Sequence, residues 1–430
     1  MCSGCFDYVI IGNSTAAVGA VEAIRSIDKL RSIAVVSAEA EHTYSRPLIT
    51  YYLAGKVHEE NVYYRPKDFY EKMDVACHLG VEVDLVVCDA REVRLTGGGK
   101  LGYGKLLIAA GGAPIAPAIP GIDRPGVFFM NTLEDARRAK GWLSHTRRSV
   151  VIGAGLTGMK TAEALVQMGK QVTVVEMADR VLPTVLDSRA ANIVKKWFSS
   201  RGVDVLTGVM VVELEGREDS NDVWRAVLSS GESIACDSVF VTVGVRPRIE
   251  LVRNSPIRTD KGILVDRTMR TSVGDVYAAG DIAQAYEPIT GEQRVVPILP
   301  NAYIGGRIAG INMAGGNARY NVGMSANSTA FFGLSVMSAG LANVEDGSDF
   351  HIITRDSGLA YRKLVFRDGR LVGMIAVADV EGVGLLTGIM RDGIDVHGLE
   401  AKLLDGTIRL IDLPADIRAA RLEGKSLKWT

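Results

Sequence analysis

Three glycines in the middle of the chain have the spacing of a phosphate-binding turn. Gly153, Gly155 and Gly158 directly follow an apolar run and open a segment with helical periodicity. Such a turn lets the backbone approach a pyrophosphate and directs a helix N-terminus at its negative charge. Glu176 ends the next apolar run, 18 residues after Gly158, where a carboxylate can accept hydrogen bonds from both hydroxyls of a ribose. The pattern predicts a bound dinucleotide.

Glu176 also indicates which dinucleotide binds. Its carboxylate would repel a 2′-phosphate, so the sequence favours NAD(H) over NADP(H). Arg180, four residues later, is near enough in sequence to weaken this preference. The competing interpretation, a glycine-rich turn without a ligand, is disfavoured because the strand, the helix and the acid are all present.

A second turn, near the N-terminus, is less regular. It keeps Gly12 but has Ser14 and Ala17 at the second and third glycine positions. Ser37 ends the following apolar run, where an acid is expected, and Glu39 stands two residues later. Ribose binding at this turn therefore falls either to Glu39 or to backbone groups.

Both turns need a strand before them and a helix after them. Later apolar runs end at Ala110 and Gly111 and at Gly244, as further strands of the same two sheets would. Each unit is a βαβ motif, which predicts an α/β fold with two doubly wound, three-layer Rossmann-like domains. The predicted strand, helix and strand lie at 6–11, 15–27 and 33–36 in the first unit and at 149–152, 156–168 and 171–175 in the second.

Prolines indicate where the chain passes between these domains. The three prolines within 113–121 exclude regular structure, and 245–247 is a plausible return crossing. Near the end of the chain, apolar and polar residues alternate over 362–366 and resume at 370–372 after an Asp-Gly turn, which predicts a hairpin. We therefore predict one domain at 1–118 and 245–322, a second at 119–244, and a C-terminal α+β domain at 323–430.

Composition argues against several classes of function. The 49 basic and 50 acidic residues leave a formal charge of −1, so no net field attracts nucleic acid, and we expect no nucleic-acid partner. The longest apolar runs fall far short of the ~20 residues of a membrane-spanning helix. The N-terminus lacks the basic start of a secretory signal. We therefore expect a cytoplasmic protein with no membrane segment.

The five cysteines are too few and too scattered for a disulfide framework. Cys2 and Cys5 have the spacing of half a metal site, but no second pair or nearby histidine completes it. We expect two reduced surface thiols there and no bound metal, with a docking surface for a partner as the weaker alternative. Cys77, Cys88 and Cys236 lie in or beside apolar runs and are expected to be buried.

The segment 271–281 resembles the second FAD motif of the pyridine nucleotide-disulfide oxidoreductase superfamily. In that family the residue at Asp281 holds the ribityl chain, and Gly280 precedes it. Together with the two turns, the strand end at 109–112 and the segment 300–307, the resemblance covers nearly the whole chain. It implies FAD on 1–118 and 245–322, NAD on 119–244 and an interface domain, with hydride passing between nicotinamide C4 and flavin N5.

The stretch 44–53 indicates the branch of the family. It carries no redox-active cysteine and instead resembles, through Arg46 and Pro47, the signature of rubredoxin reductases, ferredoxin reductases and the flavin subunits of multisubunit redox enzymes such as phenylglyoxylate dehydrogenase. The resemblance implies that electrons from NADH leave the flavin for a one-electron iron–sulfur protein or subunit. It also makes a homodimer through the C-terminal domain plausible.

Two residues depart from the family pattern. Ferredoxin reductases often place a lysine where Tyr51 stands and a glutamate where Lys160 stands. Our hypothesis is that Lys160 lies near flavin N5 and stabilises negative charge on the reduced flavin; the alternative is a solvated helix lysine. Tyr51 is either a ring-stacking residue of the same site or part of a core. Two other functions remain open: a flavin-only NADH oxidase that reduces O2, and a non-catalytic FAD-binding subunit.

Overall fold

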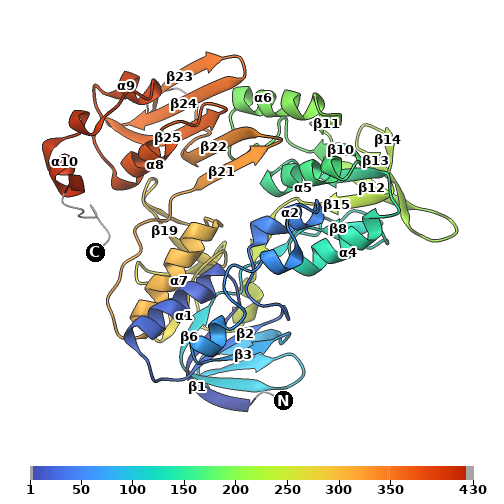
Figure 1. Cartoon of the computed structure of the whole chain (residues 1–430). Helices are drawn as coiled ribbons and strands as arrows, with labels where there is room; N and C mark the ends of the chain where they lie inside the picture. The colour runs from blue at the N-terminus through green and yellow to red at the C-terminus, as the bar shows by residue number, and fades with distance from the viewer. Residues whose placement is uncertain (1–2, 346, 348, 423–430) are drawn as a thin grey trace.

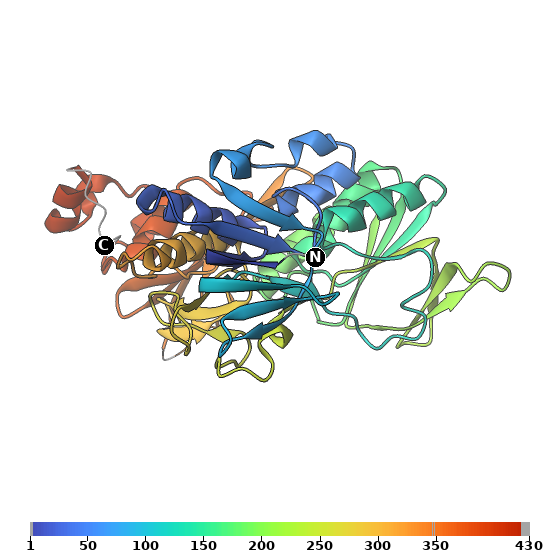
Figure 2. The same ribbon diagram turned by 90° about the horizontal axis from the view of Figure 1, so that it is seen from below.

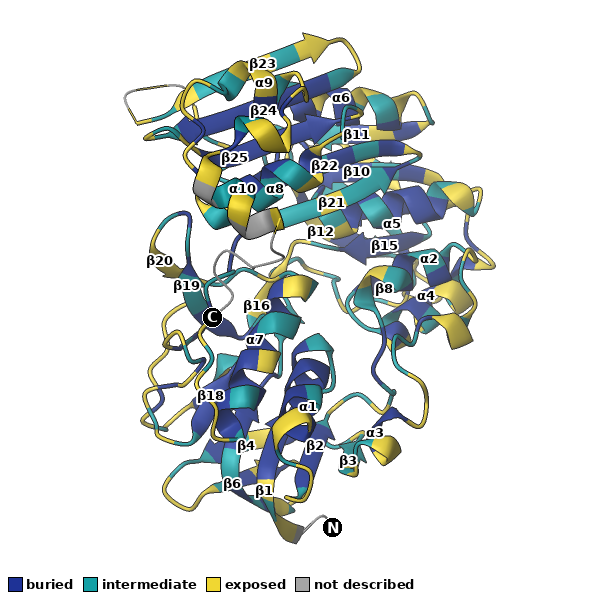
Figure 3. Cartoon of the chain, turned by 60° about the vertical axis from the view of Figure 1, so that its left-hand side comes forward, coloured by how far each residue is buried: buried dark blue, intermediate teal, exposed yellow. Residues whose placement is uncertain are grey.

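The computed structural model describes residues 3–345, 347 and 349–422. Figure 1 shows three regions, each built around its own sheet: an N-terminal region, a middle region and a C-terminal region. The β12–β13 hairpin (Val211–Gly216 and Val223–Leu228) and helix α10 (Ala415–Leu422) lie at opposite ends of the molecule, as Figure 2 shows from below. Buried residues concentrate in the strands, whereas α9 (Glu400–Leu404), α10 and many loops carry exposed ones (Figure 3).

The N-terminal region contains a seven-stranded sheet with helices α1 (Thr15–Ile27) and α7 (Leu299–Met313) packed together. An ideal Cβ at Gly306 would stand 2.0 Å from the Ala16 carbonyl oxygen, so glycine allows the two helices to approach closely. The strand order is β3-β2-β1-β6-β5-β4, with β18 beside β6: β1 Ser3–Ile11, β2 Ile33–Ser37, β3 Val75–Leu79, β4 Val83–Val87, β5 Glu92–Leu95, β6 Lys100–Ile108 and β18 Val276–Ala278.

Shorter elements complete this region. They are η1 Arg46–Leu48, η2 Glu59–Asn61, α3 Phe69–Lys72, η3 Ile249–Val252 and a small sheet of β17 Ile263–Leu264, β19 Ala283–Glu287 and β20 Glu292–Arg294. Helix α2 (Ile49–Leu53) follows η1 but packs against α4 (Leu133–Leu143) and α5 (Leu156–Gln167) of the middle region (Figure 1).

The middle region is a parallel five-stranded sheet in the order β11-β10-β9-β15-β8, with an antiparallel three-stranded sheet beside it. The crossings from the N-terminal region, β7 (Gly112–Pro114) and β16 (Val245–Pro247), pair with each other. The elements are β8 Val127–Phe129, α4 Leu133–Leu143, β9 Arg148–Ile152, α5 Leu156–Gln167, β10 Gln171–Glu176, α6 Ser188–Ser199, β11 Val203–Thr207, β12, β13, β14 Ser233–Ala235 and β15 Ser238–Val241.

The C-terminal region is an antiparallel sheet in the order β21-β22-β25-β24-β23. The predicted hairpin is confirmed as β24 and β25. Its elements are β21 Ala326–Phe331, β22 Leu334–Gly340, β23 His351–Ser357, β24 Ala360–Arg367, β25 Arg370–Val377, α8 Val383–Asp392, α9, η4 Leu410–Asp412 and α10.

The middle and C-terminal regions share one apolar core. It runs from α2 through α5 and α6 into β21, β22 and β25. Phe198 is fully buried and meets the rings of Phe331 and Phe332 edge-on, with centroids 5.5 and 5.2 Å away. The Trp197 indole N–H donates to the Phe331 carbonyl, 2.8 Å away. These contacts fix the two regions against each other.

The predicted fold class is confirmed, and the predicted strands and helices around both turns lie within two or three residues of the observed ones. Of the three cysteines expected to be buried, Cys236 is buried, Cys88 is only half-buried, and the expectation for Cys77 was wrong. Cys77 is exposed, because β3 is the edge strand of its sheet. The polar residues Arg362 and Lys363 of β24 are buried, because the Arg362 guanidinium reaches the Leu404 and Glu381 carbonyls and the Lys363 ammonium reaches the Val344 carbonyl.

Among the described residues, no helix is long and apolar enough to cross a membrane. The longest helix among the described residues, α7, has 15 residues.

Candidate functional site

The turn between β9 and α5 leaves no space for side chains at two of its glycines. Gly153 has a φ of 97°, and an ideal Cβ there would stand 2.7 Å from the Thr242 carbonyl oxygen. A Cβ at Gly158 would stand 1.9 Å from the Gly153 carbonyl oxygen. At Gly155, by contrast, a Cβ would meet nothing within 4 Å, and this residue lines a cavity of about 740 Å³. The open side of the turn has the room that a pyrophosphate needs.

Side-chain caps are present at α4 and α6 and absent at the two helices that follow the glycine turns, as they are at α2, α3, α7, α8 and α9. Helices α4 and α6 begin with side-chain caps, in which Thr132 and Asp187 accept hydrogen bonds from backbone N–H groups of the first turn. Helices α1 and α5, which follow the two turns, have no side-chain cap. Their first N–H groups therefore remain available to an anion.

Glu176 lines the cavity beside the β9–α5 turn. Its carboxylate accepts hydrogen bonds from the backbone N–H groups of Ala154, at 2.6 Å, and Ala178, at 2.8 Å. Gly244, with a φ of 108°, lines the same cavity. Arg180 is not among the lining residues, and its guanidinium pairs with Asp179 at 3.1 Å. The carboxylate is thus held toward the cavity, while the guanidinium is engaged elsewhere.

A second cavity lies over the β1–α1 turn in the N-terminal region. Gly12 has a φ of 110°, and a Cβ there would stand 2.2 Å from the Ala109 carbonyl oxygen. Ala17 is fully buried in α1, and Pro47 is the second residue of η1, which begins at Arg46; neither Ala17 nor Pro47 lines the cavity. The predicted residues that do line it are Gly12, Ser14, Ser37, Glu39, Arg46, Ala110, Gly111, Gly280 and Asp281.

Glu39 is tied to neighbouring side chains. The Arg46 guanidinium donates to the Glu39 carboxylate and to the Asn131 carbonyl. The Tyr44 hydroxyl donates to the same carboxylate at 2.5 Å, and burial raises the pKa of this phenol, so that it remains a donor. The ion pair of Glu39 and Arg46 fixes the loop after β2 against the start of α4.

Asp281 differs from Glu39 in lacking such partners. Its carboxylate accepts no hydrogen bond from the residues that the structure describes, although it lines the cavity beside Gly280. Burial raises the pKa of Asp281, and the charge of Arg46 opposes this shift. The Asp281 side chain is half-buried and lines the cavity, so a ligand there can supply the hydrogen-bond donors that it lacks. Hydroxyl groups, such as those of a ribityl chain, are the donors that would fit.

The two cavities meet. Asn131, which follows β8, and Val245, which begins β16, line both of them. Ligands in the two cavities would therefore approach each other at this shared wall. In the described part of the chain, no cysteine lines either cavity.

Lys160 and Tyr51 lie together, outside the linings of both cavities. The Lys160 ammonium donates to the Tyr51 hydroxyl at 3.2 Å and to the Ala330 carbonyl at 3.1 Å, and it lies 4.6 Å from the centre of the Tyr51 ring. It also forms an ion pair with Glu163. Glu163 is buried and accepts the backbone N–H of Phe332 at 2.7 Å. This cluster joins α2, α5 and the β21–β22 turn.

Sequence reasoning missed two residues of this arrangement. Glu163 stands three residues after Lys160 on the same helix, which is the spacing of an intrahelical ion pair, so a signal existed. Asn131 gave no signal, because its position at the shared wall depends on how two regions of the chain meet.

The Cys2–Cys5 pair cannot be followed in full, because Cys2 lies outside the described residues. Cys5 is exposed on β1. Within the described residues, no cluster of three or more cysteine, histidine or acidic side chains is suited to hold a metal ion.

Comparison with known families gives this arrangement its context. Residues 6–324 match the family model of the pyridine nucleotide-disulphide oxidoreductases. The chain belongs to this family. Residues 326–394 match the rubredoxin NAD+ reductase C-terminal domain. Members of the family are flavoprotein oxidoreductases that bind FAD and NAD(P)H. The uncapped helix starts, the space at Gly155 and the unpartnered Asp281 carboxylate fit these two nucleotides.

Individual relatives cover most of the chain. It is 33% identical to the NADH-dependent phenylglyoxylate dehydrogenase subunit epsilon of Aromatoleum evansii over 92% of this chain and 94% of the relative. It is 30% identical to the rubredoxin-NAD(+) reductase of Pseudomonas putida over 71% and 80%, respectively. The fold matches putidaredoxin reductase in its covalent complex with putidaredoxin, with a TM-score of 0.85 and 24% identity over 91% and 94%.

Proposed function

We propose that this protein takes electrons from NADH through FAD and passes them singly to an iron–sulfur protein or subunit. The observation that carries the proposal is the shared wall at Asn131 and Val245, where two nucleotides would meet in a space without a cysteine among its described lining residues. FAD, when bound, accepts a hydride and can release electrons one at a time. Because no described thiol would lie beside the flavin, its electrons would pass most simply to an external acceptor.

Different residues of the chain would bind different parts of the two nucleotides. The N-termini of α1 and α5 would hold the two pyrophosphates, and Asp281 would accept hydrogen bonds from the ribityl hydroxyls. Arg46, fixed by Glu39 and Asn131, would close the FAD cavity from the side of the middle region. Residues 1–118 and 245–322 would thus form the FAD domain, 119–244 the NAD domain and 323–430 the interface domain.

We assign NADH, rather than NADPH, as the electron donor. The Glu176 carboxylate is positioned by two backbone N–H groups at the cavity and would accept hydrogen bonds from the ribose hydroxyls. The same negative charge would repel a 2′-phosphate. Arg180, the nearest candidate to offset this repulsion, is paired with Asp179.

The names of the relatives support the class of acceptor. One is a subunit of an NADH-dependent dehydrogenase, one is a rubredoxin reductase, and the structural neighbour is a reductase joined to its putidaredoxin partner. Each fits electron transfer between a nicotinamide nucleotide and a separate protein or subunit.

The direct test is anaerobic oxidation of NADH by the FAD-loaded protein, with rubredoxin and a [2Fe–2S] ferredoxin as separate acceptors. We expect NADH to bleach the flavin absorbance and at least one acceptor to be reduced catalytically, with two acceptor molecules per NADH. In air without an acceptor, peroxide formation should be much slower than acceptor reduction.

Other outcomes would contradict the proposal. Stoichiometric reduction of O2 at the rate of NADH oxidation, with neither carrier accelerating it, would indicate an NADH oxidase. Failure of NADH to bleach the bound flavin would indicate a non-catalytic subunit.

Light scattering on the same preparation tests the proposed homodimer, which would show twice the 46.1 kDa mass of the chain.

A further inference from the structure

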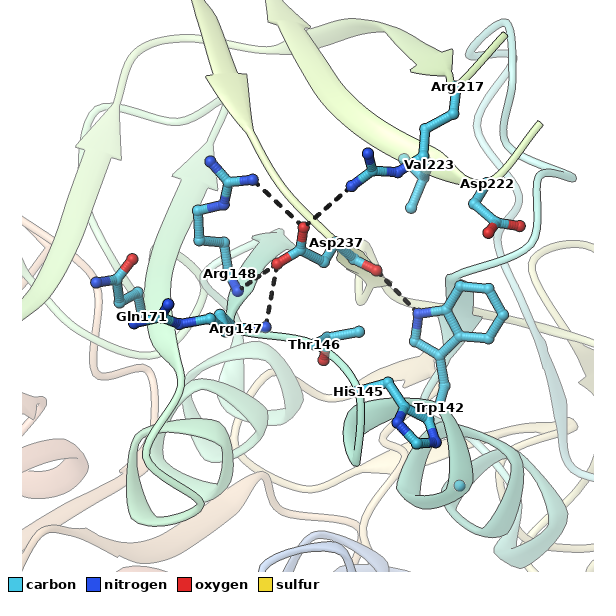
Figure 4. A pocket seen from close by; sticks show the side chains of 11 residues that line it. Trp142, His145, Thr146, Arg147, Arg148, Gln171, Arg217, Asp222, Val223 and Asp237 are labelled. Carbon is cyan, nitrogen blue, oxygen red and sulfur yellow. Dashed lines mark hydrogen bonds and ion pairs between the residues drawn. The ribbon is translucent and has the colours of Figure 1, made fainter. Parts of the chain in front are cut away.

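A separate cavity lies at the other end of the middle sheet (Figure 4). Its volume is about 840 Å³. Arg148 and Gln171, the first residues of β9 and β10, line it, whereas Ile152 and Glu176, the last residues of the same strands, line the dinucleotide cavity. Five residues of extended chain separate the two by about 13 Å. The cavity is therefore distinct from the site of the proposed reaction.

Positive charge predominates in its lining. Its lining contains three arginines, Arg147, Arg148 and Arg217, and two aspartates, Asp222 and Asp237, which gives a net charge of +1 with neutral histidine. The lining thus favours an anion. Because the excess of positive charge is small, it favours a ligand with one negative charge over a ligand with two.

Two of these guanidinium groups converge on one point. Those of Arg148 and Arg217 approach the same Asp237 oxygen, Oδ1, at 3.3 and 3.7 Å, from two different sheets (Figure 4). The other oxygen, Oδ2, accepts the backbone N–H groups of Arg147 and Arg148 at 3.0 and 2.9 Å. Each guanidinium has five N–H groups, and both side chains are about half exposed. Asp237 therefore holds an arginine pair that retains donors for a second carboxylate.

Asp237 also positions Trp142, an aromatic side chain that lines the cavity. The Trp142 indole N–H donates to the Asp237 carbonyl at 2.9 Å. Phe128 meets the indole edge-on on the core side, with centroids 6.2 Å apart. The arginine pair is thus bound to the Asp237 carboxylate and the indole to the Asp237 carbonyl, and all three side chains line the cavity.

We propose that this cavity binds a small aromatic monocarboxylate. The carboxylate would lie between Arg148 and Arg217, and the ring would lie along Trp142. Asp222, which also lines the cavity, would repel a second negative charge. The proposal does not depend on the identity of the electron acceptor.

Equilibrium dialysis of radiolabelled benzoate against the FAD-loaded protein, with NAD+ at saturation, tests the site. We expect one benzoate per chain. Acetate, which lacks the ring, benzamide, which lacks the charge, and phenyl phosphate, which carries a second charge, should each compete at least about tenfold less well. The flavin spectrum should not change, because the site lies away from the flavin.

Variants locate the binding. Arg148→Ala and Arg217→Ala should each weaken benzoate binding at least about tenfold, and Trp142→Leu about fivefold. Lys196→Ala removes an exposed positive charge from α6 of the same region and should bind benzoate like the parent protein. Normal FAD content and an unchanged thermal midpoint establish that each variant is folded.

Three results would overturn the proposal. These are parent-like binding in both arginine variants, equal competition by benzamide or phenyl phosphate, and displacement of benzoate by NAD+. Each would show that benzoate binds elsewhere or without the recognition described.

Discussion

The two nucleotide cavities are built from similar turns but closed in different ways. The NAD-side cavity is lined entirely by residues between Pro114 and Val245, so one continuous stretch of chain supplies it. The FAD-side cavity is lined by segments from 11–112, 131–132, 245–251 and 280–302.

The acidic residues show the same difference. Glu176 serves the cavity of its own βαβ unit and is positioned by local backbone N–H groups. Glu39, its counterpart by sequence, is paired with Arg46. The unpartnered acid of the FAD cavity is Asp281, which comes from a segment far along the chain. With the nucleotides bound as proposed, NADH would be recognised by residues of one βαβ unit and FAD by residues from segments far apart in the chain.

The largest expected effects come from substitutions of the turn glycines, each of which should impair ligand binding in one cavity and leave the other cavity unaffected. Gly12→Ala forces a side chain into a positive φ and against the Ala109 carbonyl, a backbone cost of about 1–3 kcal/mol before the clash is counted. We expect FAD binding to weaken at least about a hundredfold, measured by the ratio of flavin to protein absorbance. Gly158→Ala should retain FAD but lose NADH binding.

Gly384→Ala is the matched control, because a Cβ there meets nothing within 4 Å. It should keep both ligands. If Gly12→Ala lost NADH binding while retaining full FAD, the assignment of the two cavities would be reversed.

Asp281→Asn tests whether this carboxylate contributes to FAD binding. Charge-assisted hydrogen bonds contribute about 1.5–3 kcal/mol each, so the dissociation constant of FAD should rise roughly ten- to a hundredfold, as measured by fluorescence titration of the deflavinated protein. Asp275→Asn alters a nearby exposed acid that is paired with Arg91 and should leave FAD affinity unchanged. Equal effects of the two substitutions would argue against a specific role for Asp281.

Glu176→Ala tests local recognition at the NAD cavity. We expect kcat/KM for NADH to fall about tenfold and the preference for NADH over NADPH to shrink by a similar factor, with FAD content unchanged. Glu232→Ala, at an exposed acid in the same region, serves as the control. An unaltered ratio of NADH to NADPH activity would remove Glu176 from nucleotide selection.

The smallest expected effect lies at the ion pair of Lys160 and Glu163, outside the linings of both cavities. Lys160→Ala alone would leave the buried Glu163 carboxylate without its partner, which costs about 3 kcal/mol of stability. The double variant Lys160→Ala, Glu163→Gln avoids this penalty. If the Lys160 charge stabilises the reduced flavin, rapid mixing of the double variant with NADH should show flavin reduction slowed about fivefold.

Tyr51→Phe keeps the ring beside Lys160 and removes only the hydroxyl that accepts its hydrogen bond, so its rate should change less than about twofold. A rate of flavin reduction in the double variant equal to that of the parent would exclude Lys160 from the reaction.

Local sequence patterns predicted the local structure. The helix 15–27 and the hairpin of β24 and β25 were predicted closely, because apolar periodicity and turn chemistry act over a few residues. Burial was predicted less well. Cys77 is exposed because its strand is at the sheet edge, and Arg362 is buried because α9 and the loop after β25 supply carbonyl partners. Neither neighbour is near in sequence.

The sequence by itself determined the fold class and the two glycine turns, and it predicted phosphate binding at those turns and ribose binding at Glu176, since each depends on residue types at short spacing. Only the tertiary structure decided that Glu39 is engaged by Arg46, that Asn131 and Val245 form a wall common to both cavities, and that Lys160 is paired with Glu163 against the C-terminal region. The physical reason is that a side chain's partner is set by which distant segments pack against it.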